Sequence, residues 1–163
     1  MLFKIKIIYK IVMVTKYIFD LDGTLYKDIG YFKYSNIKAN PMLRYYLKIL
    51  KNCYIFTNGT KFHLENCLKR LKCTSCFKNT ISREEFFPYL KPSIHPYRFS
   101  IIKFNLLNDK VIFFEDQLIN LKTAKLFGWT TVYIGRLKNL PNYVNFQFST
   151  INQALKFFIN NFR

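Results

Sequence analysis

The sequence predicts an α/β protein built on a mainly parallel β-sheet. Short apolar runs alternate with stretches of helical periodicity along the chain, and this alternation is typical of βαβ units. Half of the residues are hydrophobic, as in a globular protein. The 163 residues leave room for one domain, and the chain contains no repeats, low-complexity tracts or linkers. We therefore expect a single domain over residues 1–163.

The N-terminal residues 1–13 are predicted to be an extension of this domain. They are apolar, but Lys4, Lys6 and Lys10 interrupt them, and they contain no small-residue cleavage site. A signal peptide is therefore not predicted, and Met13 is an alternative translation start. No apolar run reaches the roughly 20 residues of a membrane span, and four cysteines in a chain with an evident core do not indicate a disulfide framework. We expect an intracellular, cytoplasmic protein.

The first half of the chain predicts two buried strands that each end at polar residues. Residues 17–19 run into Asp20, and residues 53–56 run into Thr57. Between them, Pro41 begins a helix with three leucines on one face. After Thr57, a helix is predicted from about residue 61 to residue 71, with an apolar face of Leu64, Cys67, Leu68 and Leu71.

The second half continues the same alternation. In chain order it predicts a short strand at 79–82, a helix from Pro96 to about Leu107, a strand at 111–114 that ends at Glu115-Asp116, a helix at 117–127 stopped by Gly128, a strand at 130–134 and an amphipathic helix at 150–161. In parallel sheets, ligands bind at the carboxyl ends of the strands. The polar residues that follow the strands therefore mark the predicted site.

Acidic residues are scarce and concentrated at these strand ends. The chain has nine Asp and Glu, and four of them form the two tight pairs Asp20/Asp22 and Glu115/Asp116. The sequence thus places nearly half of its carboxylates in two spots, which points to chemistry rather than to surface charge.

Four segments resemble, in order, the motifs of the haloacid dehalogenase superfamily. They are FDLDGTLY (19–26), IFTNG (55–59), Lys91-Pro92 and FFEDQLINLKTAKLFGWTTV (113–132), and the likeness extends over residues 17–135. It implies a three-layer, Rossmann-like fold with helices on both faces of the sheet. Within the superfamily, the chain is most similar to pyrimidine 5′-nucleotidase-like phosphatases. These carry a histidine after the second motif, here His63, and an asparagine after the acidic pair, here Asn120.

The resemblance implies phosphoryl transfer through a covalent intermediate. Asp20 matches the nucleophile, because a carboxylate can form and release a phosphoryl group. Asp22 matches the general acid that protonates the leaving oxygen and then activates water. Family dehalogenases lack this second aspartate, so its presence favours phosphatase chemistry.

The same resemblance implies a magnesium site and a phosphate cradle. Mg²⁺ prefers oxygen ligands. We expect the ion to bind the carboxylates of Asp20 and Asp116 and the backbone carbonyl of Asp22. Glu115 would be a direct or a water-mediated ligand.

The phosphate would lie against Thr57, Asn58, Lys91 and Gly23, whose hydroxyl, amide, ammonium and tight turn suit an anion. His63 is either a specificity residue or a structural one. Asn120 either supports the site or caps a helix.

A zinc site is an alternative use of the cysteines. His63 and Cys67 have helical i, i+4 spacing, and Cys73 and Cys76 form a C-x₂-C pair. Against this, Cys67 falls on the apolar face of its predicted helix, so structural thiols are the favoured interpretation.

The chain is predicted to lack the cap domain of pyrimidine nucleotidases. Thr57 follows Asp20 by 37 positions and Lys91 follows Thr57 by 34. This leaves only a flap of about residues 26–40 beside the crossover helix. An open site should result, because caps exclude water and select small substrates. The flap aromatics (Tyr26, Tyr31, Phe32 and Tyr34) either stack on a base or ring of the substrate or pack in the protein.

The predicted function is a Mg²⁺-dependent phosphatase that acts on a phosphate monoester through an aspartyl-phosphate. The net charge of +17 either attracts polyanions or reflects A/T-rich codon bias. The substrate is therefore a nucleotide, a nucleic-acid end or a phosphoprotein. The alternative is a catalytically silent basic protein of this fold that binds nucleic acid. The oligomeric state stays open.

Overall fold

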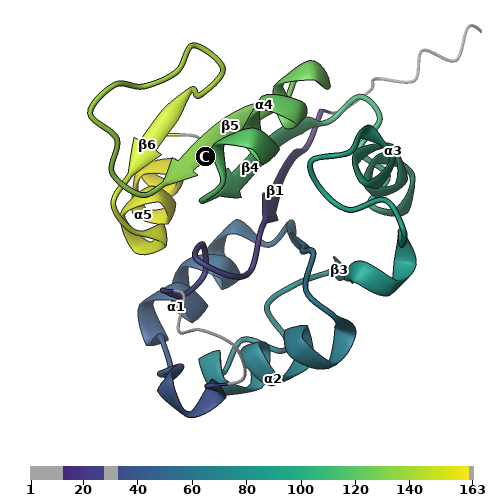
Figure 1. Ribbon diagram of the computed structural model, residues 1–163. Helices are drawn as coiled ribbons and strands as arrows, with labels where there is room; N and C mark the ends of the chain where they lie inside the picture. The colour runs from purple at the N-terminus through teal and green to yellow at the C-terminus, as the bar shows by residue number, and fades with distance from the viewer. Residues whose placement is uncertain (1–12, 28–32, 162–163) are drawn as a thin grey trace, which may run out of the picture.

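A computed structural model describes residues 13–27 and 33–161 and shows a six-stranded parallel sheet in the order β3-β2-β1-β4-β5-β6 (Figure 1). Each neighbouring pair of strands is parallel. This confirms the predicted α/β class. The strands are β1 (Thr15–Phe19), β2 (Cys53–Phe56), β3 (Asn79–Ile81), β4 (Lys110–Glu115), β5 (Thr130–Ile134) and β6 (Phe146–Phe148).

In the described part of the chain, four α-helices and two 3₁₀ turns lie between the strands, and a fifth helix follows the last strand. The helices are α1 (Pro41–Leu50), α2 (Lys61–Leu71), α3 (Ile94–Lys103), α4 (Leu118–Leu126) and α5 (Ile151–Asn161), and the 3₁₀ turns are η1 (Tyr34–Asn36) and η2 (Arg83–Glu85). Most predicted elements are confirmed within a residue or two.

Helices cover both faces of the sheet, which gives the three layers expected. The apolar faces of α1, α2 and α5 pack in one buried cluster, and those of α3 and α4 pack in another. Successive side chains of a strand point to opposite faces. Accordingly, Tyr17 and Phe19 of β1 join the first cluster, and Ile18 joins the second.

One α-helix and one strand differ from the prediction, and neither 3₁₀ turn was predicted. Helix α3 begins two residues before Pro96 and ends at Lys103. A proline is tolerated in a first turn, where its missing N–H would have no partner. The helix ends early because Asn105 adopts a positive φ of 50° and the N–H of Leu106 bonds back to Ile101. Strand β6 was not predicted, because three partly buried residues are too short to show a period.

The described residues near the site hold no cap domain. Between β1 and β2 they form an isolated Asp22–Tyr26 bridge, η1 and α1, and between β2 and Lys91 they form α2, β3 and η2. Residues 1–12, with most of the predicted extension, lie outside the described part, as do Tyr31 and Phe32. In the described part, each helix is too short or too polar to cross a membrane. All four cysteines are buried and free.

Candidate active site

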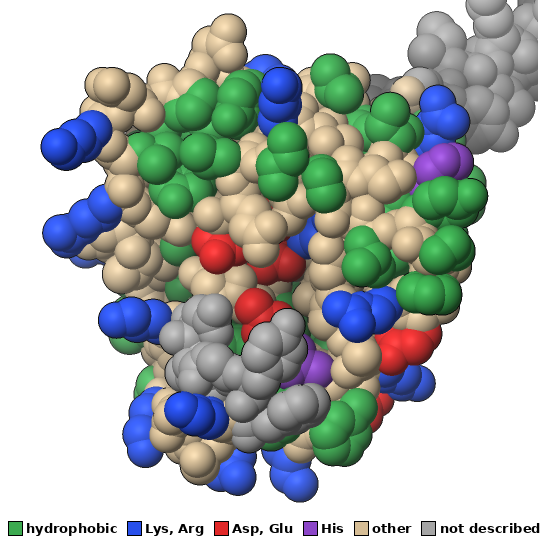
Figure 2. All heavy atoms as spheres, in the orientation of Figure 1, with side chains coloured by type: hydrophobic (Ala, Val, Ile, Leu, Met, Phe, Trp, Pro, Cys, Tyr) green, Lys and Arg blue, Asp and Glu red, His purple; other side chains and the backbone are tan. Residues whose placement is uncertain are grey.

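The sheet order brings the predicted site residues together at one edge of the sheet, the one formed by the carboxyl ends of its strands. Strand β1 lies between β2 and β4, so Asp20, Thr57 and Glu115, at the carboxyl ends of these strands, are neighbours. Figure 2 shows acidic side chains gathered near the middle of this face, with Lys, Arg and hydrophobic side chains around them.

Lys91 connects three of these segments through its ammonium group. Its Nζ donates to Asp20 Oδ1 at 2.7 Å, to Glu115 Oε2 at 2.9 Å and to the carbonyl of Phe56 at 2.8 Å. The Lys91 side chain is only 1% exposed. Burial alone would lower the pKa of Lys91, but the two carboxylates outweigh it and raise that pKa. A permanent buried cation therefore stands beside the predicted nucleophile.

Glu115 anchors this network and has no accessible surface. Its Oε1 accepts the N–H groups of Asp116 at 3.0 Å and Gln117 at 3.1 Å, and its Oε2 accepts from Lys91 and from Asn120 Nδ2 at 2.9 Å. A carboxylate offers about four acceptor sites, so all are used. A metal held by Glu115, directly or through a water that donates to the carboxylate, would therefore have to displace or share one of these hydrogen bonds. Asn120 supports Glu115 and does not cap α4.

The donor set at this edge suits a hard divalent cation. Asp20, Glu115 and Asp116 each offer an oxygen, and the three oxygens lie within 4.8 Å of one another. Asp116 Oδ1 is buried and finds no hydrogen-bond donor among the described residues. Such an oxygen is costly to bury alone, and oxygen-rich sites are those that Mg²⁺ prefers.

Burial and the neighbouring carboxylates raise the pKa values of Asp20 and Asp116. Burial, followed by the charge of Glu115, raises the pKa of Asp20 to about 7, although Lys91 opposes the shift. Burial and then Glu115 raise the pKa of Asp116 to about 8. A nearby cation would favour the ionised forms, so the acids fit a bound metal.

Gly23 is required where the chain passes Asp116. Its φ is +74°, which L side chains rarely adopt, and an added Cβ would lie 2.1 Å from Asp116 Oδ2. The predicted role of Gly23 in a tight turn thus extends to making room for a carboxylate.

Thr57 and Asn58 shape the loop after β2. The buried Thr57 Oγ1 accepts the N–H of Gly59 at 2.9 Å, so the hydroxyl proton remains available for an anion. The Asn58 side chain exchanges two 2.9 Å hydrogen bonds with the main chain of Lys91. Any phosphate contact from Asn58 would therefore come from its backbone, and the side chain instead holds Lys91 in place.

Asp22 lies in a separate polar cluster that the sequence did not reveal. Its Oδ1 lies 2.7 Å from His63 Nε2 and accepts the Tyr26 hydroxyl. The Tyr34 hydroxyl lies 3.0 Å from His63 Nδ1, and the Tyr26 oxygen lies 3.1 Å from Cys67 Sγ. The described flap tyrosines thus direct their hydroxyls at the protein. The i, i+4 spacing of His63 and Cys67 brings two members of this cluster together, but it gave no sign that Asp22 and Tyr26 would meet them.

These contacts shift two further pKa values. Hydrogen bonds to Asp22 and then to Cys67 raise the pKa of His63 to about 11, against the effect of burial. Burial would raise the pKa of Asp22, but the hydrogen bonds from His63 and Tyr26 outweigh it, and the net direction is downward. Both shifts favour an imidazolium beside a carboxylate when no substrate is bound.

The proposed zinc quartet is not assembled. Within the described residues, two groups of three could share an ion, and neither includes Cys73 or Cys76. His63 and Cys67 meet Asp22 instead.

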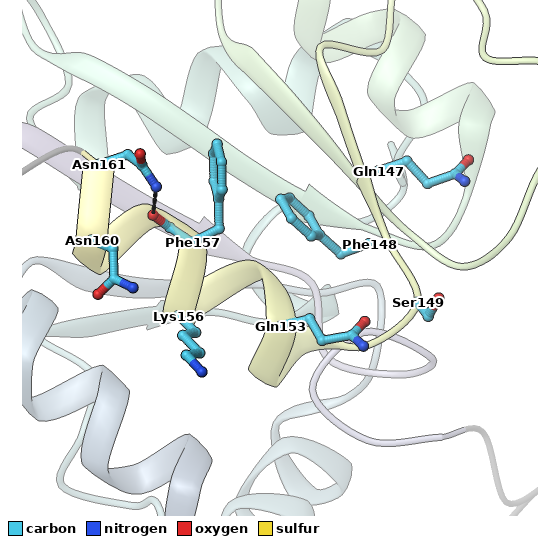
Figure 3. Close-up of a pocket in the computed structure, with 8 residues that line it drawn as sticks. All are labelled: Gln147, Phe148, Ser149, Gln153, Lys156, Phe157, Asn160 and Asn161. Carbon is cyan, nitrogen blue, oxygen red and sulfur yellow. Dashed lines mark hydrogen bonds between the residues drawn. The ribbon is translucent and has the colours of Figure 1, made fainter.

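A hollow of about 440 Å³ lies away from this edge, between β6 and α5 (Figure 3). Amide side chains, Lys156 and two phenylalanines line it, and it contains no carboxylate, histidine or cysteine. None of the predicted site residues lines it.

Comparison with known proteins decides the family. The family model of haloacid dehalogenase-like hydrolases matches residues 30–134. The chain belongs to this family of hydrolases. The matched range includes Thr57, Lys91 and Asp116 and begins after Asp20 and Asp22. Among curated protein sequences, none matches the chain.

Solved structures of this family share the fold. A dehalogenase is 25% identical, with a TM-score of 0.63 over 76% of this chain and 59% of its own. A Thermotoga maritima protein assigned as a β-phosphoglucomutase is 16% identical, with a TM-score of 0.70 over 91% of this chain and 100% of its own. The hydrolase YfnB from Bacillus subtilis, solved bound to magnesium, is 17% identical. Its TM-score is 0.60 over 69% of this chain and 52% of its own. The chain spans 59% and 58% of the first two dehalogenase structures.

Proposed function

We propose that this protein is a Mg²⁺-dependent phosphatase that hydrolyses a phosphate monoester with Asp20 as nucleophile. The observation that carries the proposal is the position of Asp22. Its Oδ2 lies 3.7 Å, and Thr57 Oγ1 3.2 Å, from the point where a Cβ on Gly59 would stand. A second carboxylate thus faces the predicted phosphate loop beside the nucleophile. Displacement of a halide needs no such acid, whereas departure of an alkoxide does.

The first step transfers the phosphoryl group to Asp20. Lys91 binds Oδ1 of Asp20, and the other oxygen attacks phosphorus. As the new O–P bond forms, the bond from phosphorus to the ester oxygen breaks. That oxygen takes a proton from Asp22 and leaves as an alcohol. Against the effect of burial, the hydrogen bonds from His63 and Tyr26 lower the pKa of Asp22 in the free protein, and the negative charge of the bound phosphate would raise it again and favour the protonated form.

The second step regenerates the enzyme. A water attacks the phosphorus of the aspartyl-phosphate and gives its proton to the Asp22 carboxylate. The bond from phosphorus to Asp20 breaks, and inorganic phosphate leaves. Positioned charges supply most of the catalysis in such transfers, and here Lys91 and the Thr57 hydroxyl are the fixed donors.

Magnesium would be held by a carboxylate oxygen of Asp20, a carboxylate oxygen of Asp116 and the backbone carbonyl of Asp22, with Glu115 as a direct or a water-mediated ligand. Bound there, it supplies positive charge that offsets the nucleophile and the phosphate. The unpaired Asp116 Oδ1 supports this assignment.

The substrate is proposed to be a nucleotide-type or macromolecular phosphate. The open edge and the +17 charge support an anionic polymer, such as a phosphorylated nucleic-acid end. Side-by-side hydrolysis of mononucleotides and 5′-phosphorylated oligonucleotides distinguishes these classes. Hydrolysis of mononucleotides alone would exclude the polymer.

The test of the function is hydrolysis of an aryl phosphate with and without Mg²⁺. Asp20→Asn should lower the rate by at least about a thousandfold, while Glu65→Gln, a change at an exposed carboxylate on α2, should leave it unchanged. Chloride release from 2-chloropropionate without phosphatase activity would instead show a dehalogenase. Inactivity on both substrates, with salt-sensitive nucleic-acid binding, would indicate the silent binding protein.

A further inference from the structure

We propose that Tyr26 and His63 are positioning residues that hold the Asp22 carboxyl in the orientation needed for proton transfer. This inference rests on the proposed function and concerns the same site. It assigns a role to the side chains of Tyr26 and His63, and to that of Tyr34, which contacts His63.

Both residues bind the same oxygen of Asp22. His63 Nε2 lies 2.7 Å from Oδ1, and the Tyr26 hydroxyl donates to that oxygen as well. In the neutral Nε2–H tautomer and in the imidazolium alike, Nε2 donates to Asp22. Two donors from different segments fix both torsions of a short side chain.

Fixing Oδ1 determines where Oδ2 points. Oδ2 lies on the side of Gly59 and Thr57, which is where the leaving oxygen of a substrate held by Thr57 would be. The Asp22 side chain is 41% exposed, so few packing contacts restrain it. Hydrogen bonds therefore provide most of its orientation.

His63 is itself held firmly. Thr60 Oγ1 accepts the His63 N–H at 3.2 Å at the start of α2. The Tyr34 hydroxyl lies 3.0 Å from Nδ1. The ring also packs on Gly59, where an added Cβ would come within 2.9 Å of His63 Cδ2. The imidazole thus has a fixed place before any substrate arrives.

A metal ion on Asp22, His63 and Cys67 is the rival explanation of this cluster. The three ligand atoms lie within 4.8 Å of one another. However, the Tyr26 oxygen lies 3.3 Å from His63 Nε2 and 3.1 Å from Cys67 Sγ and also bonds to Asp22. The hydroxyl occupies the space between the ligands, so the cluster is a hydrogen-bond network.

The positioning role makes a prediction that depends on the leaving group. An acidic phenol departs with little help from a proton, whereas an alkoxide needs one. Loss of orientation at Asp22 should therefore harm hydrolysis of an alkyl phosphate far more than that of a nitrophenyl phosphate. A defect that merely loosened the fold would lower both rates alike.

The experiment compares Tyr26→Phe, His63→Leu and His63→Gln on both substrates. Tyr26→Phe and His63→Leu should each lower kcat on the alkyl phosphate by about tenfold or more. The nitrophenyl phosphate should lose less than about threefold, and KM should change less than about twofold. His63→Gln keeps a side-chain N–H donor and should recover most of the loss. Glu65→Ala on the same helix serves as control.

A second measurement tests the contact without activity. The chain has only two histidines, so ¹⁵N NMR of the imidazoles resolves His63. Its signals should shift in Asp22→Asn and stay unchanged in Glu65→Ala. The inference is overturned if the His63 signals do not shift in Asp22→Asn. It is also overturned if Tyr26→Phe and His63→Leu lose kcat equally on both substrates, or if either variant has a higher kcat than wild type. A response of His63 to Zn²⁺ that requires Cys67 would favour the rival. If wild type hydrolyses neither substrate, the proposed function and the positioning role both fall, even where the NMR contact stands.

Discussion

Alanine at Gly23 and at Gly128 forms a matched pair of perturbations. Both glycines have φ of 74°, so alanine at either position incurs the same backbone cost, about 1–2 kcal/mol. An added Cβ at Gly128 meets no atom within 4 Å, whereas at Gly23 it would lie 2.1 Å from Asp116 Oδ2 and 2.6 Å from its Cγ. The pair therefore separates backbone strain from displacement of Asp116.

The expected size of the site effect follows from these separations. Non-bonded atoms approach to about 3 Å or more, so the Asp116 carboxylate must withdraw by about 1 Å in Gly23→Ala. A displacement of that size in a catalytic group costs about a hundredfold in rate. Mg²⁺ affinity should also fall by about tenfold or more, because Asp116 is its proposed direct ligand.

The assay joins urea unfolding with Mg²⁺ calorimetry and aryl phosphate hydrolysis. Gly128→Ala should lose about 1–2 kcal/mol of unfolding free energy and Gly23→Ala at least as much, because of its contact with Asp116. Only Gly23→Ala should lose activity and metal affinity. If Gly23→Ala keeps kcat and Mg²⁺ affinity within about threefold of wild type, Asp116 is not a direct Mg²⁺ ligand.

Two further predictions concern the charges of the site. Lys91→Met leaves Asp20 and Glu115 buried without their cation, so the free energy of unfolding at pH 7 should fall by about 3–5 kcal/mol in urea denaturation. Adding Glu115→Gln should restore part of it, and an unaltered stability of Lys91→Met would contradict the network. Burial and Glu115 raise the folded-state pKa of Asp20 to about 7 and of Asp116 to about 8. Without metal, the folded protein therefore keeps protons that the unfolded chain loses above its ordinary pKa of 3.8, and stability should fall as the pH rises through about 4 to 8. Thermal stabilisation by Mg²⁺ should grow over that range, and a pH-independent shift would refute it.

The sequence predicted the edge of the site well because strand ends are local features. An apolar run followed by a polar residue marks Thr57 and Glu115 directly, and parallel pairing then brings them together. Helix α2 was predicted at its observed bounds because its leucines repeat on one face. The structure adds the Thr60 side chain, which caps the start of the helix.

What the sequence could not supply were contacts set by the paths of loops. The Asn58 side chain pairs with the main chain of Lys91, 33 residues away. The tyrosines of the flap meet His63 across 37 and 29 positions. Neither contact follows from periodicity or propensity, since both depend on where two irregular segments pass each other. Short elements such as β6 failed for a different reason, namely too few residues to show a pattern.

The central place of β1 also bears on when the site is lost during opening of the protein. Strand β1 has a paired neighbour on each side, β2 and β4, while β3 and β6 form the edges of the sheet. Native-state opening begins where few contacts hold the chain, and central strands exchange their amide hydrogens last. The Asp20 N–H bonds to the carbonyl of Phe114 at 2.9 Å and should be among the slowest to exchange. Fraying of either edge strand would then leave the proposed nucleophile Asp20 in place.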